Sequence, residues 1–291
     1  MTGHQEGGHR PNQRVIDLFD RFTHGGMDRR QFLEKLTVLA GSSAAAMALL
    51  PVLENNYAKA DLLPEGDPRI KTETIDVKGT KVYLASPTGG AKWPAVLVIH
   101  ENRGLNPHIK DVTRRLAAEG FLAGGADFLS QAGGTPADAD KAREMIGALD
   151  KPATEAAARD VVAALRARPD SNGKVGAIGF CWGGGLVNRL AVTDPTLDAG
   201  VAYYGMQPDP KDVPQIKAPL LLHYAGIDDR INAGIPAYEA ALKAAGTNFE
   251  LHTYEGVNHA FNNDTNAARY DKKAADLAWS RTVAFLHKSL G

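Results

Sequence analysis

The stretch from Gly176 to Gly185 reads GAIGFCWGGG and decides the fold prediction. It overlaps an apolar run, residues 174–179, that has the length and composition of a buried strand. Small residues then flank Cys181, with a glycine two positions before it and another two positions after it. A sharp strand-to-helix turn needs such neighbours, because side chains there would collide with the turn. The pattern predicts a thiol presented above the sheet edge and beside a helix start, which favours the thiolate. A buried, inert cysteine is the structural alternative.

The sequence around this stretch alternates between strand-like and helix-like patterns. Two alternating segments, 72–77 and 82–85, flank Lys78-Gly79 and predict an antiparallel hairpin. Residues 95–100 form a continuous apolar run, and a helix pattern follows from about His108 to Glu119. This alternation predicts an α/β fold with a mostly parallel central sheet and helices on both faces. Further strand-like runs lie at 121–126, 199–204, 220–224 and 249–254.

A thiol nucleophile needs a base, and the base needs a carboxylate that orients it. Asp228 and His259 each follow a predicted strand, where the carboxyl ends of parallel strands meet at one edge of the sheet. The chain order Cys181, Asp228, His259 is that of the α/β-hydrolase fold. Asp229 is an alternative acid, and a helix cap is the structural alternative for Asp228. The order predicts a Cys-Asp-His triad.

Three motifs resemble the dienelactone hydrolase family, the carboxymethylenebutenolidases, over about residues 70–290. They are HENRGLNP from His100, GFCWGG from Gly179 and NHAF from Asn258. The resemblance implies hydrolysis of a small ester or lactone through a thioester on the cysteine, with no cofactor. It also implies that Glu101 takes the proton of Cys181 when substrate binds. The structural alternative for this carboxylate is an ion pair with its neighbour Arg103.

The resemblance further implies where an oxyanion and a substrate are held. Backbone N–H groups of Asn102 and Trp182 are the expected oxyanion hole. Dienelactone-cleaving members carry an arginine four residues after the catalytic histidine, and here Asn263 stands at that position. This departure argues against dienelactone as the substrate, although the reaction type is retained. The remaining candidates for substrate contacts are Arg103, Arg143, Tyr204, Phe261 and Arg269.

Residues 1–60 differ in character from the rest of the chain. Residues 1–26 are rich in Gly, His, Arg and Gln, and we expect a disordered or weakly helical leader there. Arg29-Arg30 then precede a small and apolar run of about 14 residues, 37–50, and Ala58-Lys59-Ala60 follows it. That order resembles a twin-arginine export signal. The run is shorter than the roughly 20 residues of a membrane span.

These features predict a leader over residues 1–60, cleavage after Ala60 and a hydrolase domain over residues 61–291. The expected location is the periplasm or the exterior, reached through the twin-arginine export machinery. The alternative is a cytoplasmic protein whose N-terminus forms an ordinary amphipathic helix.

The composition argues against several other classes of protein. Lys+Arg number 33 and Asp+Glu 34, a net charge of -1, so the basic excess of a nucleic-acid binder is missing. The single cysteine excludes an intramolecular disulfide and a cysteine-rich zinc site. No metal motif, phosphate loop or dinucleotide fingerprint stands in the sequence. We therefore expect a small-molecule substrate and no metal.

Three alternatives to the predicted hydrolase stay open. The loss of the arginine at Asn263 fits a catalytically silent, hydrolase-like binding protein. A general carboxylesterase with a different acyl substrate fits the same motifs. A redox-active thiol protein is the third, although the chain has no second cysteine to resolve an oxidised thiol.

Overall fold

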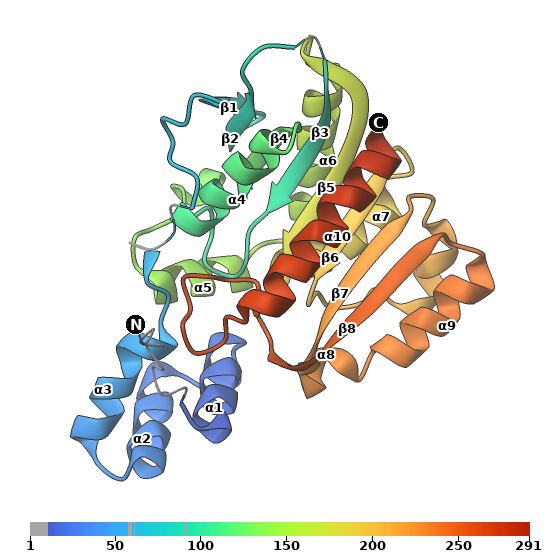
Figure 1. Ribbon diagram of the computed structural model, residues 1–291. Coiled ribbons are helices and arrows are strands. Elements are labelled where there is room, and N and C mark those ends of the chain that lie inside the picture. Colours follow the sequence, from blue (N-terminus) through green and yellow to red (C-terminus); the bar gives the residue numbers. More distant parts are fainter. Residues whose placement is uncertain (1–10, 58–59, 61, 91) are drawn as a thin grey trace, which may run out of the picture.

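The computed structural model describes residues 11–57, 60, 62–90 and 92–291. Its strands are β1 (Ile70–Val77), β2 (Thr80–Pro87), β3 (Trp93–Ile99), β4 (Leu122–Asp127), β5 (Ser171–Phe180), β6 (Ala199–Tyr203), β7 (Leu220–Ile227) and β8 (Phe249–Asn258). They form an 8-stranded sheet in the order β1-β2-β4-β3-β5-β6-β7-β8 (Figure 1). The hairpin β1-β2 and the pair β2-β4 are antiparallel, and every later pair is parallel. The predicted α/β-hydrolase fold is thus confirmed.

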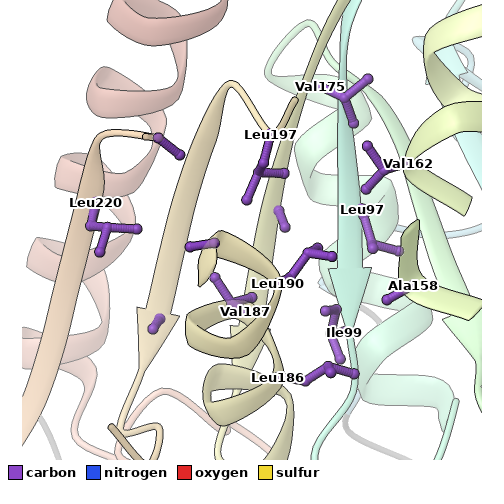
Figure 2. Close-up of a cluster of buried hydrophobic side chains, with 14 of the residues drawn as sticks. Leu97, Ile99, Ala158, Val162, Val175, Leu186, Val187, Leu190, Leu197 and Leu220 are labelled. Atoms are coloured by element: carbon purple, nitrogen blue, oxygen red, sulfur yellow. The ribbon is translucent and has the colours of Figure 1, made fainter. Parts of the chain in front are cut away.

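Helices cover both faces of this sheet. They are α4 (Pro107–Ala118), α5 (Ala139–Gly147), α6 (Lys151–Ala167), α7 (Trp182–Thr193), α8 (Asp229–Asn232), α9 (Ile235–Ala245) and α10 (Lys272–Leu290). Alternate residues of β3 point to opposite faces, as the pleat of a strand requires. Leu97 and Ile99 pack with α6 and α7, whereas Val96 and Val98 pack with α4 and α10. Figure 2 shows the first of these clusters.

The apolar run at residues 95–100 is explained by this two-sided burial. Every residue of β3 from Pro94 to Ile99 is buried. Glycines of β4 and β5 let the covering helices approach closely: a Cβ built on Gly176 would lie 3.1 Å from a side-chain atom of Leu290 in α10. The carboxyl ends of the parallel strands are consequently held rigidly, which suits a site at that edge.

The N-terminal segment is folded, contrary to the expected disorder. Residues 11–57 form α1 (Gln13–Thr23), α2 (Arg29–Ala40) and α3 (Ser43–Leu53). These helices bury a hydrophobic cluster of their own, in which Phe22 and Phe32 stack with ring centroids 4.6 Å apart. Of the two expectations for residues 11–26, disorder was wrong and a helix is present, because the apolar stripe of α1 is covered by α2 and α3, a contact that composition does not reveal. Residues 1–10 lie outside the described part of the chain.

No single helix among the described residues is both long and apolar enough to cross a bilayer. Taken together, α2 and α3 have the required length and hydropathy, but their axes are bent by 112° at the break between them.

Candidate active site

The turn between β5 and α7 has the strained geometry that the sequence predicts. Cys181 adopts φ 54° and ψ -113°, a left-handed backbone conformation that is rare for any residue but glycine. A Cβ on Gly179 would lie 2.2 Å from the carbonyl oxygen of Gly183, so no larger residue fits there. The thiol itself is buried, with 8% of the residue exposed. The turn therefore sets Cys181 at the carboxyl end of β5, one residue before α7 begins.

His259 and Asp228 meet at the same edge of the sheet. His259 Nδ1 lies 2.6 Å from Asp228 Oδ2, and both residues are buried. Asp228 also accepts a hydrogen bond from the backbone N–H of Ile231, so it caps α8 and holds the histidine at once. Asp229 is exposed in the first turn of α8. Between the two candidate acids, the geometry selects Asp228.

A second histidine, which the sequence analysis missed, contacts the thiol from the N-terminal segment. His24 Nε2 lies 3.3 Å from Cys181 Sγ. Its other ring nitrogen, Nδ1, lies 2.8 Å from the backbone carbonyl oxygen of Asp20 and 3.3 Å from the carboxylate of the same residue. The apolar spacing of Val15, Leu18 and Phe22 was the available signal for α1, which contains Asp20 and ends just before His24. No pattern connects His24 to a cysteine 157 residues away.

The charges around the thiol stabilise its ionised form. Burial raises the pKa of Cys181, but the positive charges of His259 and His24 outweigh burial and lower it to about 6. Burial lowers the pKa of His259, while the thiolate and the carboxylate of Asp228 raise it to about 10. Burial likewise opposes a charge on His24, yet the thiolate raises its pKa. The positive charges of the two imidazoles thus favour the thiolate, as the position of Cys181 beside a helix start predicts, whereas the resemblance implied a thiol that loses its proton when substrate binds.

Glu101 is also buried at this edge of the sheet, and the groups that donate hydrogen bonds to its carboxylate are neutral. Asn263 donates a hydrogen bond of 2.7 Å to Oε2, and the hydroxyl of Tyr204 donates one of 3.4 Å to Oε1. Asn263 stands where the resemblance placed a substrate-binding arginine, and here it orients Glu101. Arg103 lies 3.9 Å from Asp140 instead of pairing with its neighbour Glu101.

The expected oxyanion donors flank Cys181 and Glu101 along the chain. The N–H of Trp182 begins α7, and a first-turn N–H has no partner within its own helix. The indole ring of Trp182 stacks on His100, with centroids 5.1 Å apart, so it packs in the core. The side chain of Asn102 donates a 2.7 Å hydrogen bond to the carbonyl oxygen of Thr23, at the end of α1. Both residues thus lie at the site, and their role as oxyanion donors stays a prediction.

A small cavity of about 20 Å³ lies at the thiol. Its walls come from the N-terminal segment (Thr23, His24, Asn55) and from the sheet edge (Glu101, Asn102, Arg103, Cys181, His259, Ala260, Arg269). Of the five predicted substrate contacts, Arg103 and Arg269 therefore line the cavity. Tyr204 and Phe261 are fully buried and pack against one another, with ring centroids 5.6 Å apart. Arg143 contacts α1 instead: it donates to the carbonyl oxygen of Phe22 and covers the ring of that residue.

The contacts that attach the N-terminal segment to the sheet edge are largely polar. Arg269 lies 3.5 Å from the carboxylate of Asp20 and 5.2 Å above the ring of Phe19. Asn266 donates a 2.6 Å hydrogen bond to the carbonyl oxygen of Leu53. Among the described residues after α3, only Ala268 joins the buried apolar cluster of this segment. The segment is thus a small folded unit resting on the active site.

Comparison with known proteins places this fold and site in a family. The model of the dienelactone hydrolase family matches residues 80–290. The chain belongs to this family. A second model, described as YqhI-like, matches residues 12–41, which comprise α1, α2 and the turn between them. The predicted family is confirmed, and with it the prediction that the chain is a hydrolase.

The matched regions span nearly the whole length of two curated relatives. The carboxymethylenebutenolidase of Pseudomonas putida is 32% identical over 239 residues, which is 77% of this chain and 97% of the relative. Protein usf of Aquifex pyrophilus is 35% identical over 229 residues, 74% of this chain and 97% of the relative. Among solved structures, a dienelactone hydrolase-like promiscuous phosphotriesterase from metagenomic libraries superposes with TM-score 0.70 at 24% identity. It covers 77% of this dienelactone hydrolase family member and all of its own chain, and it supports the fold.

Proposed function

We propose that this dienelactone hydrolase family member cleaves small carboxylic esters or lactones through a thioester on Cys181. The observation that carries the proposal is the strained thiol at the end of β5, in a cavity that it shares with His259, whose other ring nitrogen is held by Asp228. This combination supplies a nucleophile, a proton carrier and a group that orients the carrier.

Acylation uses the ionised thiol directly. The sulfur attacks the carbonyl carbon, an S–C bond forms, and the π electron pair moves onto the carbonyl oxygen. The N–H groups of Trp182 and Asn102 stabilise this oxyanion, since fixed backbone dipoles need no reorganisation. When the oxyanion collapses, the C–O bond of the ester breaks and the leaving oxygen takes the proton of protonated His259. In a lactone the leaving oxygen stays attached to the acyl group.

Deacylation returns the site to its starting state. Neutral His259 takes a proton from a water molecule, whose oxygen attacks the thioester carbon. Collapse of the second tetrahedral intermediate breaks the S–C bond, releases the carboxylic acid and restores the thiolate beside a protonated imidazole. Asp228 holds Nδ1 of His259 throughout, which keeps Nε2 directed at the reacting atoms. Glu101 is assigned to take the proton from the fraction of Cys181 that is protonated when substrate binds, as the family resemblance implies.

The cavity admits substrate only after the N-terminal segment moves. A volume of about 20 Å³ holds one water molecule and no ester. His24 and Thr23 form the wall on the side of α1. Displacement of α1 would open this wall and release Arg269 from Asp20 for a carboxylate on the substrate. We therefore assign the present arrangement to a closed state of the enzyme.

The test is mass spectrometry of the protein after brief exposure to a p-nitrophenyl ester, with release of p-nitrophenol followed in parallel. We expect an acyl adduct on Cys181 and no turnover by C181A. Turnover by C181A equal to that of the wild type would contradict the proposal. A lack of both adduct and turnover across a panel of esters and lactones would instead favour a binding protein without hydrolase activity.

A further inference from the structure

Three potential metal-ligating atoms, one sulfur and two imidazole nitrogens, lie close together at the strained turn between β5 and α7. The sulfur of Cys181 and one ring nitrogen each of His24 and His259 all lie within 4.8 Å of one another. The two imidazole rings meet edge to face, with centroids 4.7 Å apart. Ester hydrolysis needs only one of these histidines, so His24 is not explained by the proposed reaction.

Each histidine is oriented by an acceptor at its other nitrogen. Nδ1 of His259 lies on the carboxylate of Asp228, and Nδ1 of His24 lies on the backbone carbonyl and the carboxylate of Asp20. An N–H at Nδ1 leaves Nε2 as the nitrogen with a free electron pair. Nε2 of His259 is buried and has no hydrogen-bond partner among the described residues. Histidines that bind metals in proteins show this same outer contact with a carboxylate or a carbonyl oxygen.

The separation of the ligands fits a small tetrahedral cation. With Zn–S of about 2.3 Å and Zn–N of about 2.1 Å, tetrahedral geometry places sulfur and nitrogen roughly 3.6 Å apart. His24 Nε2 and Cys181 Sγ are 3.3 Å apart. A third ligand within 4.8 Å of both needs only a small side-chain rotation to complete the set.

We propose that His24, Cys181 and His259 form a zinc-binding site that closes the active site. One thiolate and two imidazoles suit Zn²⁺, which prefers sulfur and nitrogen ligands and four-coordinate geometry. The fourth position falls to a water molecule, for which the adjacent cavity of about 20 Å³ has room. The site exists only when α1 lies on the sheet edge, since α1 and the turn after it supply Asp20 and His24.

The site has a direct consequence for the enzyme. Zinc binding uses the electron pairs of the thiolate and of one nitrogen on each imidazole, so the nucleophile and the proton carrier are both withdrawn from hydrolysis. The ion also ties α1 to the sheet edge. Zinc therefore holds the enzyme closed, and chelation of zinc frees it. The inference rests on the positions of the ligand atoms and stands whether or not the ester is the substrate.

Cobalt(II) titration of the metal-free, full-length protein tests the inference. We expect one Co²⁺ per chain, a near-ultraviolet band from thiolate-to-cobalt charge transfer and the intense visible bands of a tetrahedral site, all displaced by Zn²⁺. H24N should weaken Zn²⁺ binding by at least ~10-fold, measured by competition with a chromophoric chelator, because a ligand is lost. D20N should weaken it by ~10-fold, because it loses only an outer contact. H252N is the matched control, because His252 lies on β8 beside Glu250, and it should bind as the wild type does.

Two results would overturn the inference. One is a wild-type titration with no charge-transfer band. The other is an H24N variant that binds zinc as tightly as the wild type, which would show that His24 is not a ligand of the metal. If H24N proves unfolded by circular dichroism, wild-type protein alkylated at Cys181 decides the question, since it must lose the cobalt bands. Ester turnover measured in the presence of a metal chelator tests the proposed hydrolase function separately.

Discussion

At the scale of single residues, Asp228 and Asp229 provide a sharp comparison because they are adjacent and chemically identical. Only Asp228 contacts His259. We expect D228N to lower kcat/KM for a p-nitrophenyl ester by roughly 10³–10⁴-fold, because an amide in place of the carboxylate favours the wrong tautomer of the histidine. D229N should stay within about twofold of the wild type. Equal losses in both variants would show that the hydrogen bond does not matter for the reaction.

Glu101 gives a second comparison at this scale. Its carboxylate is held by Asn263 and Tyr204 in the wall of the cavity. We expect E101Q to slow formation of the acyl adduct on Cys181 by about 10²-fold near pH ~5, where the thiol is protonated, and by far less near pH ~8, where the thiolate predominates. Its melting temperature should change little, since glutamine has nearly the same shape. Stopped-flow release of p-nitrophenol measures the rate, and an unchanged burst would remove Glu101 from the mechanism.

At the scale of elements, the proposed closed state depends on the polar attachment of α1. The side chain of Arg143 on α5 donates to the carbonyl oxygen of Phe22 and covers its ring. A hydrogen bond from a charged group contributes roughly 1.5–3 kcal/mol, so R143A should raise the open population of α1 by ~10–100-fold. We expect alkylation of Cys181 by iodoacetamide to accelerate correspondingly. Mass spectrometry follows the reaction.

Lys141 supplies the control for this experiment, because it is exposed on the same helix α5. K141A should be alkylated at the rate of the wild type. If R143A also reacted at that rate, the contacts of α1 would not limit access to Cys181, and the assignment of a closed state would fail.

At the scale of the whole molecule, the N-terminal segment combines two features. Arg29-Arg30 and the apolar α3 resemble an export signal, and the same segment covers the active site. We keep twin-arginine export as a proposal. Cleavage after Ala60 would remove α1, α2 and α3 together, open the cavity and eliminate His24 from the site. The precursor would then be the closed form and the mature chain the open one.

N-terminal sequencing after cell fractionation tests this proposal. The expected result is a mature chain that begins at Asp61, outside the cytoplasm, with ester turnover higher than that of the full-length protein. Full-length protein found only in the cytoplasm would defeat it and would make α1 a permanent part of the enzyme.

Local sequence was sufficient for the sheet and for part of the site. The glycines around Cys181 predict the strained turn because backbone atoms approach too closely there for any side chain. Asp228 and His259 follow predicted strands, and parallel strands deliver their carboxyl ends to one edge. The pairing of Asp228 with His259 near Cys181 was therefore accessible from chain order, and their catalytic roles stay a prediction.

Only the tertiary structure could reveal the second histidine, the partners of Glu101 and the cover over the cavity. His24 reaches Cys181 because α1 packs on α2 and α3 and is then held at the sheet edge by Arg143 and Arg269. Each of these contacts joins residues far apart in the chain. Strands and turns are determined by short-range patterns and backbone sterics, which a sequence displays directly. The docking of one folded unit on another depends on side chains that meet only in space, and in this protein it places His24 beside the thiol and Thr23 in the wall of the cavity.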